Sequence, residues 1–160
     1  MTAITTYTVV KSLHIMAVIG AYGLPMAYPL LLPFLRRRHP RAMPGAHDVQ
    51  HHLNRVLTGP GTVLILGFGI YLASKQHLWH EFFVQFGLGA ILAIGAIGGW
   101  VVQASKRMAE LSAADVAATP EGSDPAWGVA YEALYRRYAR VELLLALVVL
   151  ATVFVMTTKP

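Results

Sequence analysis

Four stretches of this sequence are long, apolar and almost free of charge, and they constrain the fold more than any other feature. They cover residues 12–35, 56–74, 82–105 and 141–158, and the only charged residue within them is Glu142. A helix of about 20 apolar residues crosses the roughly 30 Å hydrocarbon core of a bilayer. Lipid offers backbone amides no hydrogen-bond partner, and the alternating pattern of a barrel strand is absent, so these spans are helices. The sequence therefore predicts an all-α, integral membrane four-helix bundle.

The composition supports this prediction. Charged residues make up 13% of the chain and hydrophobic residues 56%, and the mean hydropathy is +0.53. A soluble domain has about a quarter of its residues charged. Cysteine is absent, which excludes disulfides, thiolate metal sites and cysteine nucleophiles.

The chain is predicted to be a single four-span membrane domain over residues 1–160. The helices are expected at about residues 8–35, 55–74, 82–105 and 138–158, with loops at residues 36–54 and 106–137. Within the second loop, Ser112 and Asp115 have the spacing of a helix cap and predict one short helix.

The basic residues predict the orientation of the bundle. Three of them, Lys11, Lys75 and Lys159, lie on the side of the termini. The other ten lie on the opposite side, in or next to the two loops: Arg36, Arg37, Arg38, Arg41, Arg55, Lys106, Arg107, Arg136, Arg137 and Arg140. Since cytoplasmic loops carry the excess of Lys and Arg, both termini are expected on the non-cytoplasmic side. The net charge of +5 then reflects the orientation in the membrane and does not indicate nucleic-acid binding. The arginines are expected to bind anionic lipid headgroups.

Aromatic and histidine residues occur beside these arginines. Trp100, Tyr131, Tyr135 and Tyr138 are interpreted as markers of the inner membrane interface. The first loop also contains four histidines without regular ligand spacing, which we interpret as solvated: His39, His47, His51 and His52.

His14 lies about two turns inside the first span, where an ionisable side chain is costly and therefore a candidate site. It could be a haem or copper ligand or a proton relay, or it could be a histidine that is hydrogen-bonded to a neighbouring helix. Met156, at a similar depth in the fourth span, is the candidate second ligand. Lys11 either snorkels outward or binds a haem propionate.

Glu142 lies in the first turns of the fourth span, and a carboxylate at that depth requires a partner. Arg55, or a hydrogen-bonded set of Asn54 and Thr58, would supply one and form a structural clamp. Alternatively, Glu142 is a proton-accepting or substrate-binding carboxylate at the inner mouth of the bundle.

Small residues predict where helices approach closely, because association in lipid depends on tight packing. Gly59, Pro60 and Gly61 predict a kink or a tightened turn at the start of the second span. The third span contains most of the other close-approach positions: Gly87, Gly89, Ala93, Gly95, Ala96 and Gly99.

Three motifs carry a family resemblance. Residues 10–15 read Val-Lys-Ser-Leu-His-Ile, residues 59–61 read Gly-Pro-Gly, and residues 155–160 read Val-Met-Thr-Thr-Lys-Pro. In these motifs, in length and in span number, the chain resembles the bacterial predicted integral membrane proteins grouped as domain of unknown function 2269. The resemblance implies a multi-pass protein of the bacterial inner membrane and singles out Lys11, His14, Gly59, Gly61, Lys159 and Pro160. The first helix is also similar to that of the copper-resistance D proteins and the small membrane protoporphyrinogen oxidases, which implies an intramembrane histidine and haem.

No complete catalytic set or metal-ligand constellation is recognisable in the sequence. We therefore predict a non-catalytic accessory or assembly partner of a larger membrane complex, or a homo-oligomer. The alternative is a haem b- or copper-binding membrane redox protein that uses His14. A carrier or channel is ranked last, because the middle of the spans offers little polar lining beyond Tyr22 and Thr62.

Overall fold

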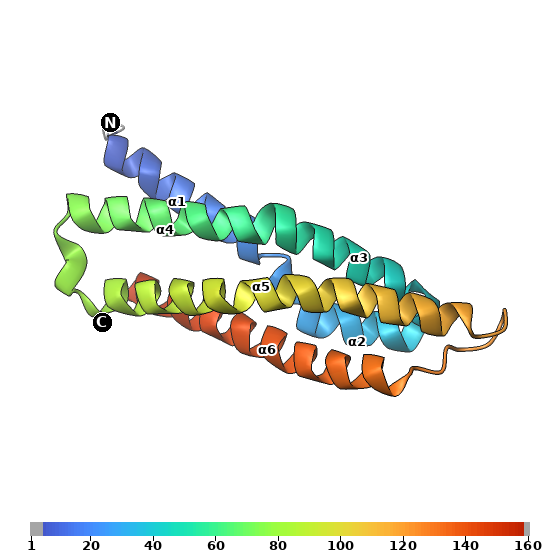
Figure 1. The fold of residues 1–160 in the computed structure, drawn as a ribbon. Coiled ribbons are helices and arrows are strands. Elements are labelled where there is room, and N and C mark those ends of the chain that lie inside the picture. The colour runs from blue at the N-terminus through green and yellow to red at the C-terminus, as the bar shows by residue number, and fades with distance from the viewer. Residues whose placement is uncertain (1–4, 159–160) are drawn as a thin grey trace.

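The computed structural model describes residues 5–158, which form helices and short connections without a β-strand. Figure 1 shows an elongated bundle in which the start of α1 and the end of α6 lie at one end, and the connection between α5 and α6 lies at the other. The elements, in chain order, are α1 (Thr6–Tyr22), η1 (Pro25–Ala27), α2 (Tyr28–Arg38), η2 (Pro40–Ala42), α3 (Met43–Leu53), η3 (Asn54–Thr58), α4 (Gly59–Lys75), η4 (Leu78–His80), α5 (Phe82–Ala117) and α6 (Val129–Thr158).

Three continuous helices are long and apolar enough to cross a membrane: Pro40–Lys75, Phe82–Ala117 and Val129–Thr158. Helices α1 and α2 form a fourth candidate span if the pair, bent by 42°, is counted as one. The all-helical prediction is confirmed, with three to four candidate spans. At a rise of about 1.5 Å per residue, a helix of 36 residues is roughly 54 Å long, so the helices extend well beyond a hydrocarbon core.

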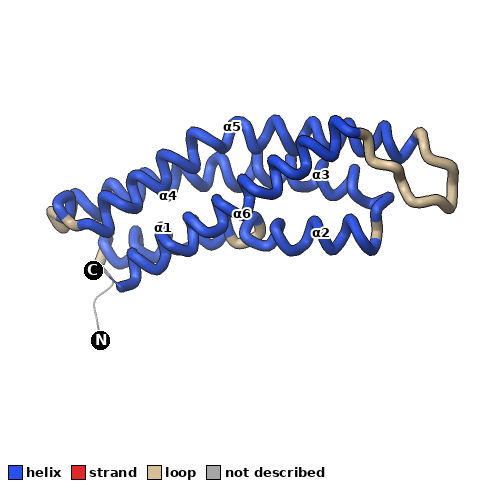
Figure 2. The backbone as a smooth tube through the Cα atoms, turned by 90° about the horizontal axis from the view of Figure 1, so that it is seen from below, coloured by secondary structure: helices blue, strands red, loops and turns tan. Residues whose placement is uncertain are grey.

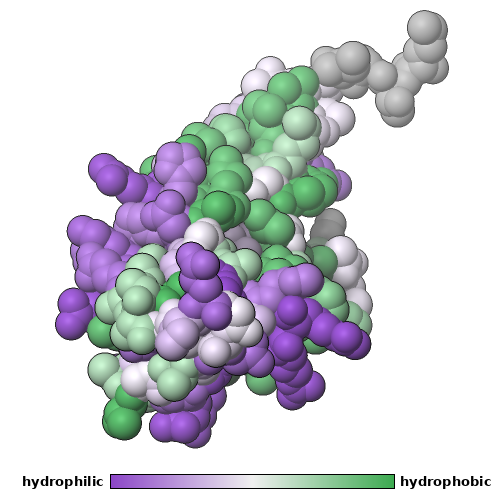
Figure 3. All heavy atoms as spheres, turned by 90° about the vertical axis from the view of Figure 1, so that its right-hand side faces the viewer, coloured by the Kyte–Doolittle hydropathy of each residue, from purple (hydrophilic) through white to green (hydrophobic). Residues whose placement is uncertain are grey.

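The two predicted loops are mostly helical, which corrects the sequence-based boundaries. Helix α3 occupies most of residues 36–54, while α5 and α6 reach into residues 106–137 and leave only 118–128 as a connection. We call this end of the bundle the basic end, and Figure 3 shows hydrophilic side chains around it. The helices continue there because their inner faces bury an aromatic core formed by Tyr28, Leu32, Met43, Val101, Ala104, Met108, Tyr131, Tyr135 and Tyr138.

The short helix predicted from Ser112 and Asp115 is wrong. Ser112 lies inside α5, and its hydroxyl donates to the Met108 carbonyl. Asp115 instead accepts a hydrogen bond from the backbone N–H of Gly128, immediately before α6, at 2.9 Å. The first N–H groups of a helix lack partners within it, so Asp115 caps the next long helix.

Buried and partly buried polar contacts stabilise the basic end. Arg36 forms an ion pair with Glu132 and lies 4.6 Å from the ring centroid of Tyr135. His47 is fully buried, 2.9 Å from the Tyr131 hydroxyl. The interpretation of the four histidines as solvated is therefore wrong for His47. The residue lies on the packed helix α3, where the sequence predicted a loop. Tyr131 and its neighbours Tyr135 and Tyr138 are buried core residues.

The first predicted span is broken rather than continuous, as the connection between α1 and α2 in Figure 2 shows. Pro25 has no N–H, so it cannot donate to the carbonyl of Ala21 as an α-helix would require. The hydroxyl of Thr58 donates to that carbonyl instead, at 3.1 Å. A side chain of the neighbouring helix thus satisfies the backbone group that the proline leaves free.

Helix α1 docks on α4 at this break. A Cβ atom added to Gly61 would lie 2.5 Å from the Cβ of Ala21, so glycine permits the close approach of the two backbones. One residue further along each helix, the hydroxyls of Tyr22 and Thr62 are 2.6 Å apart. These contacts join the end of α1 firmly to the start of α4.

Of the four α5 glycines predicted to allow close helix approach, only Gly87 packs tightly against another described helix. Gly87 packs against Met156, whose Cε would lie 2.1 Å from an added Cβ. Around Gly89, Gly95 and Gly99 an added Cβ would meet nothing within 4 Å. In the described part of the chain, these three positions therefore mediate no close helix contact, because α5 turns them toward open space.

Candidate binding cavity at Glu142

A cavity of about 450 Å³ lies in the middle of the bundle, between η3 and α4 on one side and α5 and α6 on the other. Helix α1 packs on α4 and α5 packs on α6, while α4 and α5 touch each other little. The cavity follows from this pairing, because neither pair fills the space between them. Its lining is mostly apolar and includes Ile94, Gly95, Gly98, Gly99, Val101, Leu145 and Val149.

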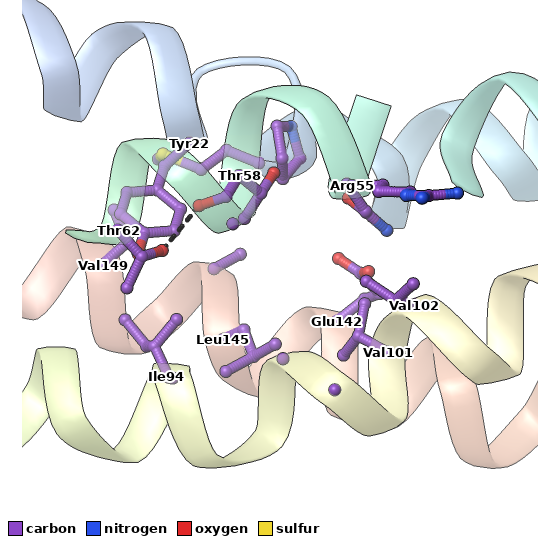
Figure 4. A pocket seen from close by; sticks show the side chains of 18 of the residues that line it. Tyr22, Arg55, Thr58, Thr62, Ile94, Val101, Val102, Glu142, Leu145 and Val149 are labelled. Carbon is purple, nitrogen blue, oxygen red and sulfur yellow. Dashed lines mark hydrogen bonds between the residues drawn. The ribbon is translucent and has the colours of Figure 1, made fainter. Parts of the chain in front are cut away.

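Glu142 provides the carboxylate of this cavity. Its side chain is 4% exposed, and Figure 4 shows the carboxylate directed into the space between the helices. The Tyr138 hydroxyl, one helical turn earlier, interacts electrostatically with this carboxylate. The side-chain amide of Asn54 donates to the same hydroxyl at 3.4 Å. Asn54 and Tyr138 therefore form a buried polar cluster with Glu142 at the cavity wall.

A π-helical turn brings Asn54 and Arg55 to this wall. In the turn, η3, the N–H of Gly59 donates to the carbonyl of Asn54, five residues earlier. Pro60 follows directly, and its ring and missing N–H are poorly accommodated by an α-helical turn. The Gly-Pro-Gly motif thus follows a widened turn, whereas the sequence predicted a kinked or tightened one. Such π-turns occur frequently at functional sites.

The predicted clamp around Glu142 takes a different form in the structure. Among residues 5–158, Arg55 forms no ion pair, and its side chain is exposed at the cavity mouth. Thr58 donates to the Ala21 carbonyl. Only Asn54 is connected to Glu142, and the connection runs through Tyr138.

The other end of the cavity is formed by the Tyr22–Thr62 hydroxyl pair, as the dashed line in Figure 4 shows. The hydroxyl of Thr62 also donates to the Thr58 carbonyl at 2.7 Å. Both hydroxyls are thereby partnered within the protein. The strongest charge available to a ligand in the cavity lies at the Glu142 end.

Sequence reasoning missed Tyr138 as a site residue because tyrosines beside basic residues are typical of a membrane interface. The structure places it fully buried. Tyr28 in the same core is 4% exposed, and its hydroxyl has no hydrogen-bond partner among the described residues. The signal for Tyr138 was its spacing, since residues four apart share one face of a helix and Glu142 is four residues later.

The candidate ligands His14 and Met156, at the other end of the bundle, pack against different glycines. His14 packs in the interface between α1 and α4, with its Cε1 3.4 Å from a Cβ added to Gly69, and its Nδ1 is buried without a hydrogen-bond partner among residues 5–158. Met156 packs against Gly87 of α5. The two side chains therefore lie in different helix interfaces, and a haem or copper site that they share stays a prediction.

Lys11 is exposed on α1. Lys159 and Pro160 of the C-terminal motif lie outside the described residues.

No group of three or more His, Cys, Asp or Glu side chains with the geometry of a metal site occurs in the described part of the chain. Comparison with protein-family models, with curated proteins and with solved structures finds no match for this chain.

Proposed function

We propose that this chain is a multi-pass protein of the bacterial inner membrane that acts, without catalysis, as an accessory or assembly subunit of a larger membrane complex. The observation that supports this proposal is an outward-facing stripe of small residues on α5. Gly89, Ala93 and Ala96 are exposed, and their spacing places them on one face of the helix. Gly87, Ile91 and Ile94, which face inward, are buried.

A stripe of small side chains lets a second helix approach closely, which is how helices associate in lipid. Among residues 5–158 no such helix covers the stripe, since an added Cβ on Gly89 meets nothing within 4 Å. The apolar helices also keep most of their surface free, since the most apolar windows of the three continuous spans are 11%, 28% and 11% buried. These surfaces are suited to lipid and to the helices of a partner.

Bulky side chains on the stripe are expected to release the partner. We predict that the wild-type chain, expressed at its natural level and extracted in mild detergent, migrates on native gels as part of a larger assembly. An Ala93→Leu/Ala96→Leu variant is expected to lower the assembled fraction about tenfold, because overpacking costs about 1–3 kcal/mol. The matched control is Ala151→Leu, at an exposed position of α6.

Two results would contradict the proposal. One is a wild-type chain that migrates as a monomer, and the other is a stripe variant that remains assembled to the same extent as the control. The mass of the assembly distinguishes a hetero-complex from multiple copies of this chain.

For the orientation, we propose that the basic end faces the cytoplasm and both termini face the opposite side. The ten basic residues of the two loops and their flanks support this, because cytoplasmic segments carry the excess of Lys and Arg. Exposed arginines at this end, such as Arg37 and Arg38, are suited to anionic lipid headgroups.

A second candidate function is haem b or copper binding at His14. The single observation in its favour is the buried Nδ1 atom without a hydrogen-bond partner in the described chain, since an unpaired imidazole nitrogen is available as a ligand. The accessory-subunit proposal predicts no Soret band and no stoichiometric copper in the purified protein. A Soret band or bound copper that disappears in His14→Ala would establish the second candidate instead.

A further inference from the structure

Two opposite charges lie at the same end of the Glu142 cavity. The buried carboxylate of Glu142 and the exposed side chain of Arg55 both line it. In the described chain, neither belongs to an ion pair. Tyr138 is the polar side chain that interacts with Glu142, and a carboxylate can accept about four hydrogen bonds. Both charged groups can therefore bind a ligand.

Most of the remaining lining of the cavity is apolar. Gly95, Gly98 and Gly99 form its wall on α5, and a Cβ added at any of the three meets nothing within 4 Å. Leu145 and Val149 of α6 line it as well. The volume of about 450 Å³ lies within the roughly 300–1,000 Å³ of typical ligand sites.

The charged end of the cavity lies where the apolar helices meet the basic end of the bundle. Val102 lines the cavity, and Lys106 follows it one turn later on α5. On α6, Arg140 precedes Glu142 by two residues. In a bilayer, Glu142 and Arg55 would therefore lie near the headgroups, with the glycine wall at the depth of the acyl chains.

We propose that this cavity binds an aminophospholipid. Its ammonium group would pair with the Glu142 carboxylate, its phosphate with the Arg55 guanidinium, and one acyl chain would lie along the glycine wall of α5. A zwitterionic headgroup places a positive and a negative charge a few bonds apart, which matches a carboxylate and a guanidinium at one mouth. This inference does not rest on the accessory role, because the α5 stripe faces away from the cavity.

The test is lipid titration by native mass spectrometry of the delipidated full chain in mild detergent. Phosphatidylethanolamine carries both charges, whereas phosphatidylglycerol carries the phosphate without the ammonium. The wild type is expected to bind phosphatidylethanolamine roughly ten- to a hundredfold more tightly, as expected for one charge-assisted hydrogen bond. Glu142→Gln is expected to abolish this preference, and Arg55→Gln to weaken binding of both lipids.

Matched controls are Glu110→Gln and Arg38→Gln, which alter exposed charges that do not line the cavity. Both are expected to bind as the wild type does. Arg55 is exposed, so its variant tests the proposal even if Glu142→Gln fails to fold. Equal binding of the two lipids by the wild type, a preference that survives Glu142→Gln, or unchanged affinities in Arg55→Gln would overturn the proposal.

Discussion

Gly61→Ala is expected to destabilise the fold by about 1–3 kcal/mol, the cost of overpacking a well-packed contact. The new methyl group would lie 2.5 Å from the Cβ of Ala21, so α1 and α4 must separate. Their separation would also strain the hydrogen bond from Thr58 to the Ala21 carbonyl and the contact between Tyr22 and Thr62. The free energy of unfolding, measured by titration with a denaturing detergent, checks this expectation.

Two further variants isolate the steric cause. Gly67→Ala places a methyl group in the same helix where nothing lies within 4 Å, so it is expected to be neutral or stabilising by up to about 1 kcal/mol. Ala21→Gly combined with Gly61→Ala removes the opposing methyl group and should recover most of the lost stability. A double variant no more stable than Gly61→Ala alone would show that the contact is not the cause.

Single cysteines are expected to be labelled from opposite sides of the membrane. The chain has no native cysteine, so each introduced thiol is a unique reporter. Gln76→Cys lies between α4 and α5, and Ser123→Cys lies in the connection between α5 and α6; both positions are exposed. In intact cells, a membrane-impermeant maleimide is expected to label Gln76→Cys at least about tenfold more than Ser123→Cys, because the proposed orientation places the basic end in the cytoplasm.

Permeabilised cells provide the control for this experiment. Both thiols should then react to a similar extent, which shows that the difference arises from the membrane rather than from local burial. Preferential labelling of Ser123→Cys in intact cells would reverse the proposed orientation. Equal labelling before permeabilisation would contradict a fixed topology.

The helical class and the candidate spans could be predicted because they depend on local properties. Hydrogen bonds within a helix join residues four apart, and the apolar length needed to cross lipid is visible in the sequence. The helix boundaries at the basic end could not be predicted by the same criterion. There, α3 and the ends of α5 and α6 are polar on their outer faces, and their stability comes from a shared buried core.

The candidate site was predicted only in part. Glu142 was identifiable because a carboxylate in an apolar span is rare, and Asn54 was named with it. Its neighbour Tyr138 resembled an interface residue. The predicted partners Arg55 and Thr58 line the same cavity, but Arg55 forms no ion pair with Glu142, and Thr58 donates to the Ala21 carbonyl instead. The rotation of each helix about its axis decides which side chains of different helices come into contact. The hydropathy pattern does not define that rotation to within one residue.

From the sequence alone follow the all-helical class, the apolar spans, and the concentration of ten of the thirteen basic residues in and beside two segments. Each of these reflects composition along a continuous segment. The three-dimensional arrangement alone decides which glycine permits a close helix contact. It also decides which polar groups meet at the cavity. The break at Pro25 and the π-turn before Gly59 change the direction and the facing of the helices that follow. One additional residue in a turn rotates the subsequent face by about 100°, so the positions of Gly61 and Glu142 relative to their neighbours depend on the folded bundle.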